Sequence, residues 1–422
     1  MAPTFIDLFA GCGGLSLGLM RAGWKGLFAV EKDTQAFATL KHNLVDDAES
    51  NGLSYEWPDW LPCKHISVSG LISGYAPYLS SLKGKVDLIA GGPPCQGFSF
   101  AGKRKKSDPR NHLFRQYLKL VEIVQPKILL LENVKGITVE FKNKSTKRKR
   151  RRTKAFSDRI KDGIEKLGYY VDAGLVKAVD FGVPQLRPRF ILVAIRKDLT
   201  DGRNVSVLQA LSELRESFLA GKGLPIDRPV SARQAISDLE RSGAELIPCV
   251  DSVGFQQIRY KRPKSTFQRL LHGTCDGSPN SMRLAKHRED VKEKFESILR
   301  TCIRGKSLSE ADRKRLGLTK QCIVALDPDK PSHTLTTLPD DLLHYAEPRI
   351  LTVRECARLQ SFPDWYEFCG KYTTGGQRRR KECPRYSQVG NAVPPLLAEA
   401  IGLVLRAEWV EMTAIFSKSA VA

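Results

Sequence analysis

The chain has 422 residues, and its 68 lysines and arginines against 46 aspartates and glutamates give a formal charge of +22. Hydrophobic residues make up 41% and charged residues 27%, a balance that is typical of folded globular proteins and excludes a largely disordered chain. No apolar run approaches the roughly 18 residues that a membrane span needs. The N-terminus also lacks the features of a signal peptide. We therefore expect a cytoplasmic protein that crosses no membrane.

The first half of the chain alternates short apolar runs with helical patterns. The runs predict strands at residues 4–9, 26–30, 86–90, 127–131 and 190–195. The helical patterns between them lie near residues 14–22, 33–43, 110–125 and 155–167. Such alternation is typical of βαβ units. It predicts an α/β fold with a doubly wound, mostly parallel sheet, in a first domain over residues 1–199.

The alternation is lost from about residue 196. Short helical patterns at residues 231–241 and 286–300, separated by stretches rich in Gly, Pro and Ser, predict a smaller irregular domain over residues 200–345. Thr352 and Glu355 have the spacing of a capping box, which predicts a helix that runs to about Gln360. A last helix at residues 394–409 has one apolar face that could pack back onto the first domain. Residues 346–422 are therefore predicted to be a hinge and C-terminal segment.

The positive charge favours a polyanionic partner such as nucleic acid, although charge alone also serves solubility. Nine of the thirteen residues from 142 to 154 are Lys or Arg, so this segment is predicted to be an exposed loop. A solvated insertion and a phosphate contact both explain it. The ten cysteines are scattered without a C-x-x-C pair, so we expect no metal site.

A glycine-rich turn, Asp7-Leu-Phe-Ala-Gly-Cys-Gly-Gly14, stands where the first strand ends and a helix begins. Its glycines would let backbone amides approach a ligand closely. Counted from Gly11, a dinucleotide fingerprint would need glycine where Ser16 stands, which weakens a dehydrogenase interpretation. Glu31 closes the second strand, where a carboxylate can accept hydrogen bonds from a ribose. A surface glutamate is the alternative, but the two features together favour an adenosine-containing cofactor.

Polar residues also cluster near the ends of later strands. Cys95 follows two prolines at the carboxyl end of the third strand, where a thiol could act as a nucleophile. Glu132 ends the next strand, and Arg187 and Arg189 precede another. We expect these residues to converge at one edge of the sheet.

Taken in order, these motifs resemble those of the DNA cytosine carbon-5 methyltransferase family of bacterial and phage type. Gln388-Val-Gly-Asn-Ala-Val393 and the segment 354–364 complete the set, and the resemblance covers nearly the whole chain outside residues 200–330. It implies S-adenosylmethionine as the cofactor and no metal. The residues that it places around this cofactor are Phe9, Gly11, Cys12, Gly13, Gly14, Leu15, Glu31, Ile66, Pro94, Leu113, Asn391 and Ala392.

The resemblance also implies roles for the residues at the sheet edge. Cys95 would add to carbon 6 of a cytosine flipped out of a specific double-stranded DNA sequence, so that carbon 5 can take the methyl group. Glu132 would hold ring nitrogen 3 and the exocyclic amine, and Arg189 would bind the carbonyl oxygen. Arg187 would orient the Cys loop, and Asn133 is expected to support that loop. A surface ion pair is the alternative for each arginine.

Two further segments follow from the same resemblance. The loop 96–111 carries glycines and a basic run, which suits a lid that closes over a phosphate backbone; a merely solvated loop is the alternative. Where the family usually has an aspartate that contacts the adenine amine, this chain reads His65-Ile66-Ser67. The adenine contact is therefore expected to differ, unless the alignment slips there.

The substrate expected from the resemblance is double-stranded DNA, read by residues 200–345 in the major groove. Residues 259–264 and 272–280 are candidates for this role, although a solvated surface explains either. We expect a monomer on DNA, associated with the nucleoid, acting alone or beside a cognate restriction endonuclease. A tRNA cytosine-5 methyltransferase and a catalytically silent DNA-binding protein are the alternatives.

Overall fold

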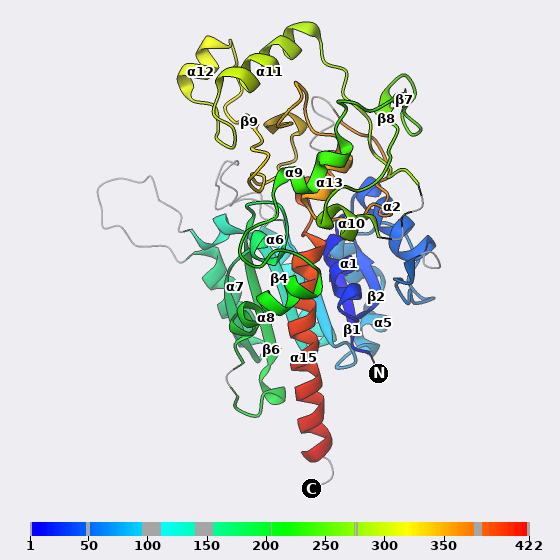
Figure 1. Cartoon of the computed structure of the whole chain (residues 1–422). Helices are drawn as coiled ribbons and strands as arrows, with labels where there is room; N and C mark the ends of the chain where they lie inside the picture. The colour runs from blue at the N-terminus through cyan, green and yellow to red at the C-terminus, as the bar shows by residue number, and fades with distance from the viewer. Residues whose placement is uncertain are drawn as a thin grey trace, which may run out of the picture.

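A six-stranded sheet forms the centre of the lower part of the molecule (Figure 1). The computed structural model describes residues 2–47, 51–94, 111–139, 155–203, 205–273, 275, 277–374 and 382–419. The strand order is β2-β1-β3-β4-β6-β5. The strands are β1 (Thr4–Leu8), β2 (Lys25–Val30), β3 (Leu88–Gly91), β4 (Ile128–Val134), β5 (Tyr169–Lys177) and β6 (Pro188–Arg196).

The sheet is mostly parallel, as predicted, with one reversed strand. β1 pairs in parallel with β2 and β3, and β3 pairs in parallel with β4. β6 runs antiparallel to both of its neighbours, β4 and β5. Only residues 178–187 connect β5 to β6, too few for the crossover that a parallel pair requires. The β5 strand was not predicted from the sequence.

Helices cover both faces of this sheet. Alternate strand residues point to opposite faces, so Ile128 and Leu130 pack with one hydrophobic cluster and Leu129 and Leu131 with the other. The first cluster contains residues of α1, α8 and α15, and the second contains residues of α4 to α7. These helices are α1 (Gly14–Arg21), α2 (Thr34–Lys41), α4 (Val68–Gly74), α5 (Ala76–Ser81), α6 (Asn111–Val124), α7 (Phe156–Lys166), α8 (Val207–Gly221) and α15 (Pro395–Ser419).

Helix α15 returns to the sheet and packs on α1 and α8, as the apolar face of the last predicted helix suggested. The contact with α1 is close: a Cβ added at Gly18 would lie 2.3 Å from the Ala398 Cβ. The stretch Arg385–Ala414 is long and apolar enough to cross a membrane, with a mean hydropathy of 1.3. Our expectation of no such stretch was therefore wrong. Its most apolar window is 83% buried inside the protein. The apolar composition is therefore that of a helix in the protein core.

The upper part of the molecule holds short elements separated by irregular chain (Figure 1). The hydrophobic cluster on the α1 and α15 side of the sheet continues into it through residues such as Phe267, Ile298 and Leu326. A small separate cluster is formed by Leu239, Ile258 and Met282. The elements here are α9 (Ala232–Ile236), β7 (Leu246–Pro248), β8 (Gln256–Ile258), α10 (Thr266–His272), α11 (Glu289–Thr301), α12 (Glu310–Arg315), β9 (Val324–Ala325) and β10 (Leu342–Leu343).

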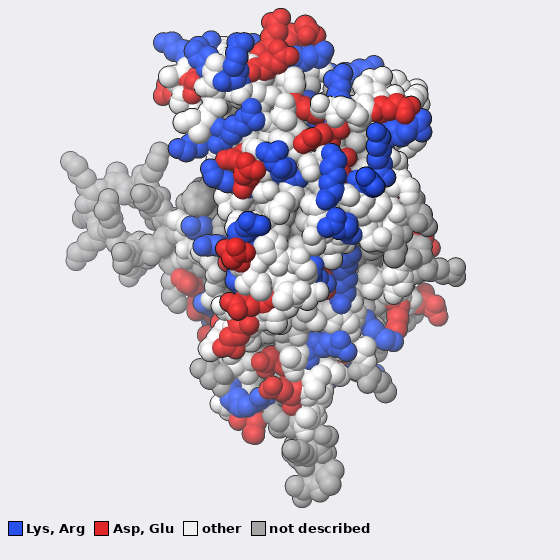
Figure 2. Space-filling model, in the orientation of Figure 1, with Lys and Arg blue, Asp and Glu red and all other residues white. Residues whose placement is uncertain are grey.

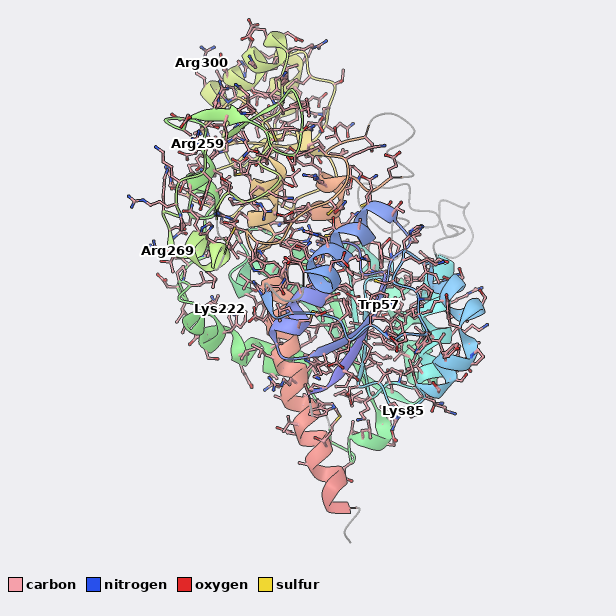
Figure 3. The ribbon with its side chains drawn as sticks, turned by 90° about the vertical axis from the view of Figure 1, so that its right-hand side faces the viewer. Trp57, Lys85, Lys222, Arg259, Arg269 and Arg300 are labelled. Carbon is pink, nitrogen blue, oxygen red and sulfur yellow. The ribbon has the colours of Figure 1, made fainter. Side chains whose placement is uncertain are left out.

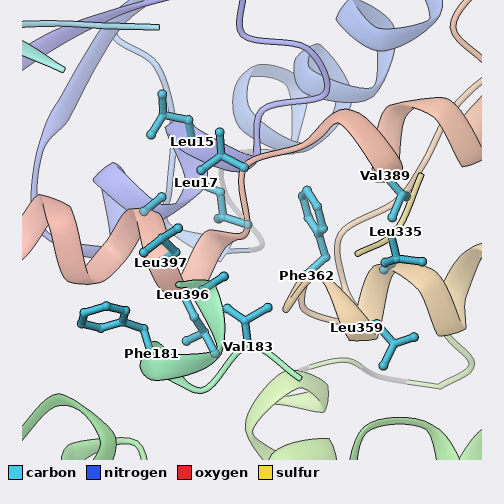
Figure 4. Packing of buried hydrophobic residues seen from close by; sticks show 14 of the residues in the cluster. Leu15, Leu17, Phe181, Val183, Leu335, Leu359, Phe362, Val389, Leu396 and Leu397 are labelled. Carbon is cyan, nitrogen blue, oxygen red and sulfur yellow. The ribbon is translucent and has the colours of Figure 1, made fainter. Parts of the chain in front are cut away.

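Two helices connect this upper part to the sheet, α13 (Val353–Leu359) and α14 (Arg385–Asn391). The capping box predicted for α13 is present: the Thr352 hydroxyl accepts from the Glu355 amide, and the Glu355 carboxylate accepts from the Thr352 amide. Figure 4 shows side chains from these helices, among them Leu359 and Val389, in the same packed cluster as Leu15 of α1. The C-terminal segment is therefore part of the core that supports the N-terminal turn.

Candidate active site

The glycine-rich turn follows β1 and has a left-handed backbone at several positions. φ is 60° at Phe9, 58° at Gly11 and 88° at Gly13, values that glycine adopts without steric cost. The turn is tied to the neighbouring strand, because the Ala10 amide donates to the Val30 carbonyl at 3.1 Å. Among the described residues, no atom lies within 4 Å of a Cβ added at Gly11, so the space beside this glycine is open on the side that they form. A ligand can approach the backbone at that point.

The next two glycines are required for a different reason, namely close packing against the C-terminal segment. A Cβ at Gly13 would lie 2.6 Å from the Tyr366 hydroxyl, and one at Gly14 would lie 2.4 Å from the Val393 carbonyl oxygen. Tyr366 also donates to the carbonyl of Cys12. The side chains of Cys12 and Leu15 are buried in the core, so these two predicted cofactor residues can reach a ligand only through their backbone.

Glu31 lies directly beside this turn. Its Oε2 accepts from the Gly11 amide at 2.9 Å, and its Oε1 accepts from the Asp33 amide at 2.8 Å. Burial raises the pKa of this carboxyl, and the amide donors partly oppose the increase. The Ile66 amide donates to the Glu31 carbonyl at 2.8 Å, so the segment around His65 passes the end of β2. The structure thus brings Glu31, Ile66 and the glycine turn together.

Two hydroxyl groups and a carboxyl form a buried hydrogen-bonded chain beneath the turn, which was not predicted from the sequence. Tyr55 donates to the Ser16 Oγ at 2.6 Å, and Ser16 donates to the Asp7 Oδ2 at 2.5 Å. All three side chains are buried. The other Asp7 oxygen has no hydrogen-bond partner among the described residues. Burial raises the pKa of Asp7 to about 7.

Glu132 and Arg189 form an ion pair at the other side of the same sheet edge. Their Oε1 and Nε atoms are 2.6 Å apart, and their side chains are 12% and 7% exposed. The reversed direction of β6 brings them together: Val134 at the end of β4 pairs with Arg189 at the start of β6. Burial lowers the pKa of Arg189, and the charge of Glu132 opposes this effect. A surface ion pair is therefore excluded for Arg189.

The turn after β3 lies against these residues. The Asn133 amide group donates to the Pro93 carbonyl at 2.9 Å, and a Cβ at Gly92 would lie 3.3 Å from the Glu132 Oε2. Asn133 thus makes the supporting contact expected of it, one residue before Pro94. Cys95 and the loop 96–110 lie outside the described residues, as does the basic segment 142–154.

Arg187 is buried and does not face a ligand. Its guanidinium donates to four oxygens, which are the Gln185 side chain and the backbone carbonyls of Leu335, Gly390 and Ala392. Burial and the nearby charge of Arg189 lower its pKa well below the ordinary value. The ion-pair alternative is excluded, because no carboxylate is among these partners. Arg187 instead ties β6 to the segment that carries Asn391 and Ala392.

The remaining predicted cofactor residues lie on elements next to the turn. Pro94 follows β3, whose last residue, Gly91, pairs with Leu8 at the end of β1. Leu113 lies in the first turn of α6 and is half-buried. Asn391 is exposed and Ala392 is half-buried. The 390–393 segment packs against the turn through Val393 and Gly14.

The comparisons with known proteins agree on one family. Residues 3–406 match the model of the C-5 cytosine-specific DNA methylase family. The chain belongs to this family. It is therefore a DNA cytosine methyltransferase, and a tRNA enzyme or a silent binding protein is not favoured.

Several known methyltransferases align over almost all of the chain. The Type II methyltransferase M.DdeI of Desulfomicrobium norvegicum is 32% identical, over 94% of this chain and 87% of its own length. The Type II methyltransferase M1.HphI of Haemophilus parahaemolyticus is 33% identical, over 95% and 86% respectively. A solved structure from E. coli, described as a DNA modification methyltransferase encoded within a prophage, has a TM-score of 0.65 and 26% identity, covering 97% of this chain and 100% of its own.

Proposed function

We propose that this methylase transfers a methyl group from S-adenosylmethionine to carbon 5 of a cytosine flipped out of a specific double-stranded DNA sequence, through a covalent bond to Cys95. The observation that carries the proposal is the Glu132–Arg189 pair beside the turn that ends at Pro94. An acidic and a basic side chain, adjacent and largely shielded from water, match the donor and acceptor atoms on one edge of a cytosine ring.

The residues around the glycine turn fit the proposed cofactor. The open space beside Gly11 would let its backbone lie against the ligand, and Glu31 stands where ribose hydroxyls are commonly bound. Phe9, Ile66, Pro94, Leu113, Asn391 and Ala392 would complete the pocket. When bound, the cofactor supplies a methyl group activated by its positively charged sulfur.

The chain's own residues would then carry the chemistry on the base. The Cys95 thiolate attacks carbon 6, and the new S–C6 bond makes carbon 5 nucleophilic enough to form a bond to the methyl carbon. Glu132 holds ring nitrogen 3 and its proton while negative charge develops there, and Arg189 binds the carbonyl oxygen. The bond between the methyl carbon and the cofactor sulfur would break with its electron pair left on the sulfur. Transfer of the carbon 5 proton to water and breakage of the S–C6 bond would then regenerate the Cys95 thiolate and leave 5-methylcytosine in the DNA strand.

Arg187 and Asn133 would act as positioning residues. Arg187 donates to the carbonyls of Gly390 and Ala392, so it fixes the cofactor side relative to β6. Asn133 holds the Pro93 carbonyl, two residues before Cys95. Neither side chain has to touch the substrate to affect the rate, because both set where reacting groups lie.

The remaining predictions belong to the same proposal. Residues 1–199 would be the catalytic domain, 200–345 the target-recognition domain and 346–422 the hinge that returns to the sheet. Lys and Arg side chains are spread over the face in Figure 2 with Asp and Glu among them, and Figure 3 shows Arg259, Arg269 and Arg300 along one side of the upper part. We propose a monomer in the cytoplasm, on nucleoid DNA, beside a cognate restriction endonuclease.

The test is conversion-based sequencing of genomic DNA from cells that lack cytosine methylation of their own. Expression of the wild-type protein should methylate one short DNA sequence, and a Cys95→Ala control should methylate none. Genomic DNA that stays unmodified under wild-type expression would contradict the proposal. Bulk tRNA from the same cells, sequenced in parallel, shows whether RNA is the substrate instead.

A further inference from the structure

The hairpin of β7 and β8 carries two apolar side chains at its tip that the protein leaves in solvent. Val250 is 80% exposed and Val253 is 100% exposed. A single exposed apolar residue is ordinary on a protein surface. Here two β-branched residues, which have few rotamers, lie three positions apart on one short loop.

Hydrogen bonds hold the loop that carries the two valines in a fixed position. The Cys249 amide donates to the Phe255 carbonyl at 2.9 Å, which closes the loop. Asp251, between the two valines, accepts from the Tyr372 hydroxyl at 2.7 Å and from the Arg385 guanidinium. Partial burial opposes ionisation of this carboxyl, but these donors lower its pKa below the ordinary value. The valines are therefore presented in a fixed position.

Positive charge gathers around the same loop. The Arg283 guanidinium lies between two rings, 4.2 Å from the centre of Phe255 and 3.9 Å from that of Tyr372. The Lys286 ammonium lies 5.4 Å from the Phe255 ring and its side chain is exposed. Asp251 is the only acidic residue in the hairpin, residues 246–258, and Arg385 neutralises it. The surroundings of the two valines therefore favour a polyanion over an acidic or neutral surface.

The hairpin is also connected to the candidate active site. Arg385, which holds Asp251, is the first residue of α14. The Gly390 carbonyl in the same helix accepts from Arg187, two residues before Arg189. One short helix thus links the hairpin to the catalytic edge of the sheet, as a contact that reads DNA sequence would require.

We propose that Val250 and Val253 contact the 5-methyl group of a thymine in the major groove of the target DNA, with Lys286 beside the neighbouring phosphates. Apolar side chains recognise thymine through this methyl group. The inference rests on the proposed function, because it assumes that the enzyme binds a specific duplex. It adds a pair of residues that determine the specificity of that binding.

The test uses the DNA sequence identified by conversion sequencing. Each thymine of the site is replaced in turn by deoxyuridine, which removes only the 5-methyl group, and kcat/KM is measured on each duplex. At one position, the kcat/KM of the wild-type enzyme should fall about fourfold, which is the effect expected from the loss of one buried methyl group. A V250A/V253A variant should show the same loss on the unmodified duplex and no further loss with deoxyuridine.

The matched control is Val410→Ala, which removes a half-exposed valine from α15. It should keep the wild-type response to deoxyuridine. The hairpin proposal fails if the wild-type enzyme ignores every deoxyuridine, if the double variant still responds to it, or if the target sequence contains only G·C pairs. In each of these cases methylation of DNA by the wild-type enzyme still supports the proposed function, so the two failures are distinguishable.

An Asp251→Asn variant tests whether the ion pair between Asp251 and Arg385 is needed to hold the loop in position. Without the ion pair to Arg385 the valines remain, but the loop loses its fixed position, so discrimination between thymine and deoxyuridine should fall. Unchanged discrimination between thymine and deoxyuridine would show that the loop does not need the ion pair to Arg385 and would overturn that part of the proposal.

Discussion

The two sides of the catalytic sheet edge are built differently. On the cofactor side, the glycine turn after β1 is enclosed by distant parts of the chain, including Tyr366 and Val393. Its carboxylate, Glu31, already accepts two backbone amides. On the base side, the side chains of Glu132 and Arg189 contact each other, and among the described residues the Arg189 guanidinium also donates to the Pro188 carbonyl.

The difference indicates how each side works. A fixed backbone can bind the same cofactor in every turnover, and it needs no free side-chain charge. The base side receives a different kind of ligand, which has to enter and leave, so its charged groups must be able to exchange partners. Each of these side chains can turn toward a polar ligand by rotation about its own bonds, and the ligand must then replace the lost partner because the pair is largely buried.

The largest expected effect is on the base side. Glu132→Gln keeps the size of the side chain but removes the carboxylate, so it cannot hold a proton at ring nitrogen 3. The rate constant for methyl transfer should fall by about 10²- to 10⁴-fold, measured in single turnover with labelled cofactor. The free energy of unfolding should fall as well, because Arg189 stays buried without its carboxylate partner. A variant that retains wild-type turnover would remove Glu132 from the mechanism.

Arg187→Ala tests the buried connection between the two sides. It leaves three backbone carbonyls without a donor and opens a cavity, which should lower the free energy of unfolding by about 3–5 kcal/mol. Urea denaturation measures this change. The control is Arg196→Ala, which breaks a surface pair with Asp198 and should cost less than about 1 kcal/mol. Equal losses for the two variants would contradict the structural role given to Arg187.

Asp7→Asn tests the raised pKa of the buried carboxyl beneath the glycine turn, through the pH dependence of stability. Folded Asp7 keeps its proton up to about pH 7, whereas an unfolded aspartate loses it near pH 3.9. Between these values the folded state holds more protons, so this group makes the protein less stable as the pH rises. Relative to wild type, the variant should gain about 2 kcal/mol between pH 5 and pH 7. Parallel stability curves in urea would refute the raised pKa.

The smallest effect on stability is expected for a substitution at Thr352, in the proposed hinge of residues 346–422. Thr352→Ala removes the hydroxyl that caps α13 and should cost about 1 kcal/mol of unfolding free energy. Thr352→Ser keeps the hydroxyl and serves as the control. Because α13 supports both sides of the site, cofactor binding and DNA methylation should decrease together, if at all. A loss confined to one activity would show that the hinge serves only that side.

Much of the fold could be predicted because β1 to β4 each contain a short apolar run and are separated by helices. β5 could not, since Asp172 and Gly174 interrupt its apolar pattern; Asp172 instead accepts from the Leu208 amide at the start of α8. The direction of β6 was also not visible in the sequence. A parallel β6 would have placed Arg189 at the opposite edge of the sheet, and only its reversal brings that residue to Glu132.

The candidate site was predicted from its sequence motifs. These motifs do not distinguish residues that would contact a ligand from residues that hold other parts of the site in place. Arg187 and Arg189 stand in one motif, yet one guanidinium binds backbone carbonyls and the other faces a carboxylate. Asp7 opens the glycine-rich motif, but its burial depends on Tyr55 and Ser16, which no short-range pattern connects. The upper part of the molecule gave the weakest prediction, because its core is shared with distant segments.

The contact between Gly14 and Val393 has a consequence for the order of events during synthesis. A ribosome makes the glycine turn some 380 residues before the segment that encloses it. Until α14 and α15 have left the exit tunnel, α1 has no partner helix and the turn has no outer wall. A nascent chain should therefore acquire affinity for its cofactor in a late step, after the sheet and residues 200–345 have already been produced.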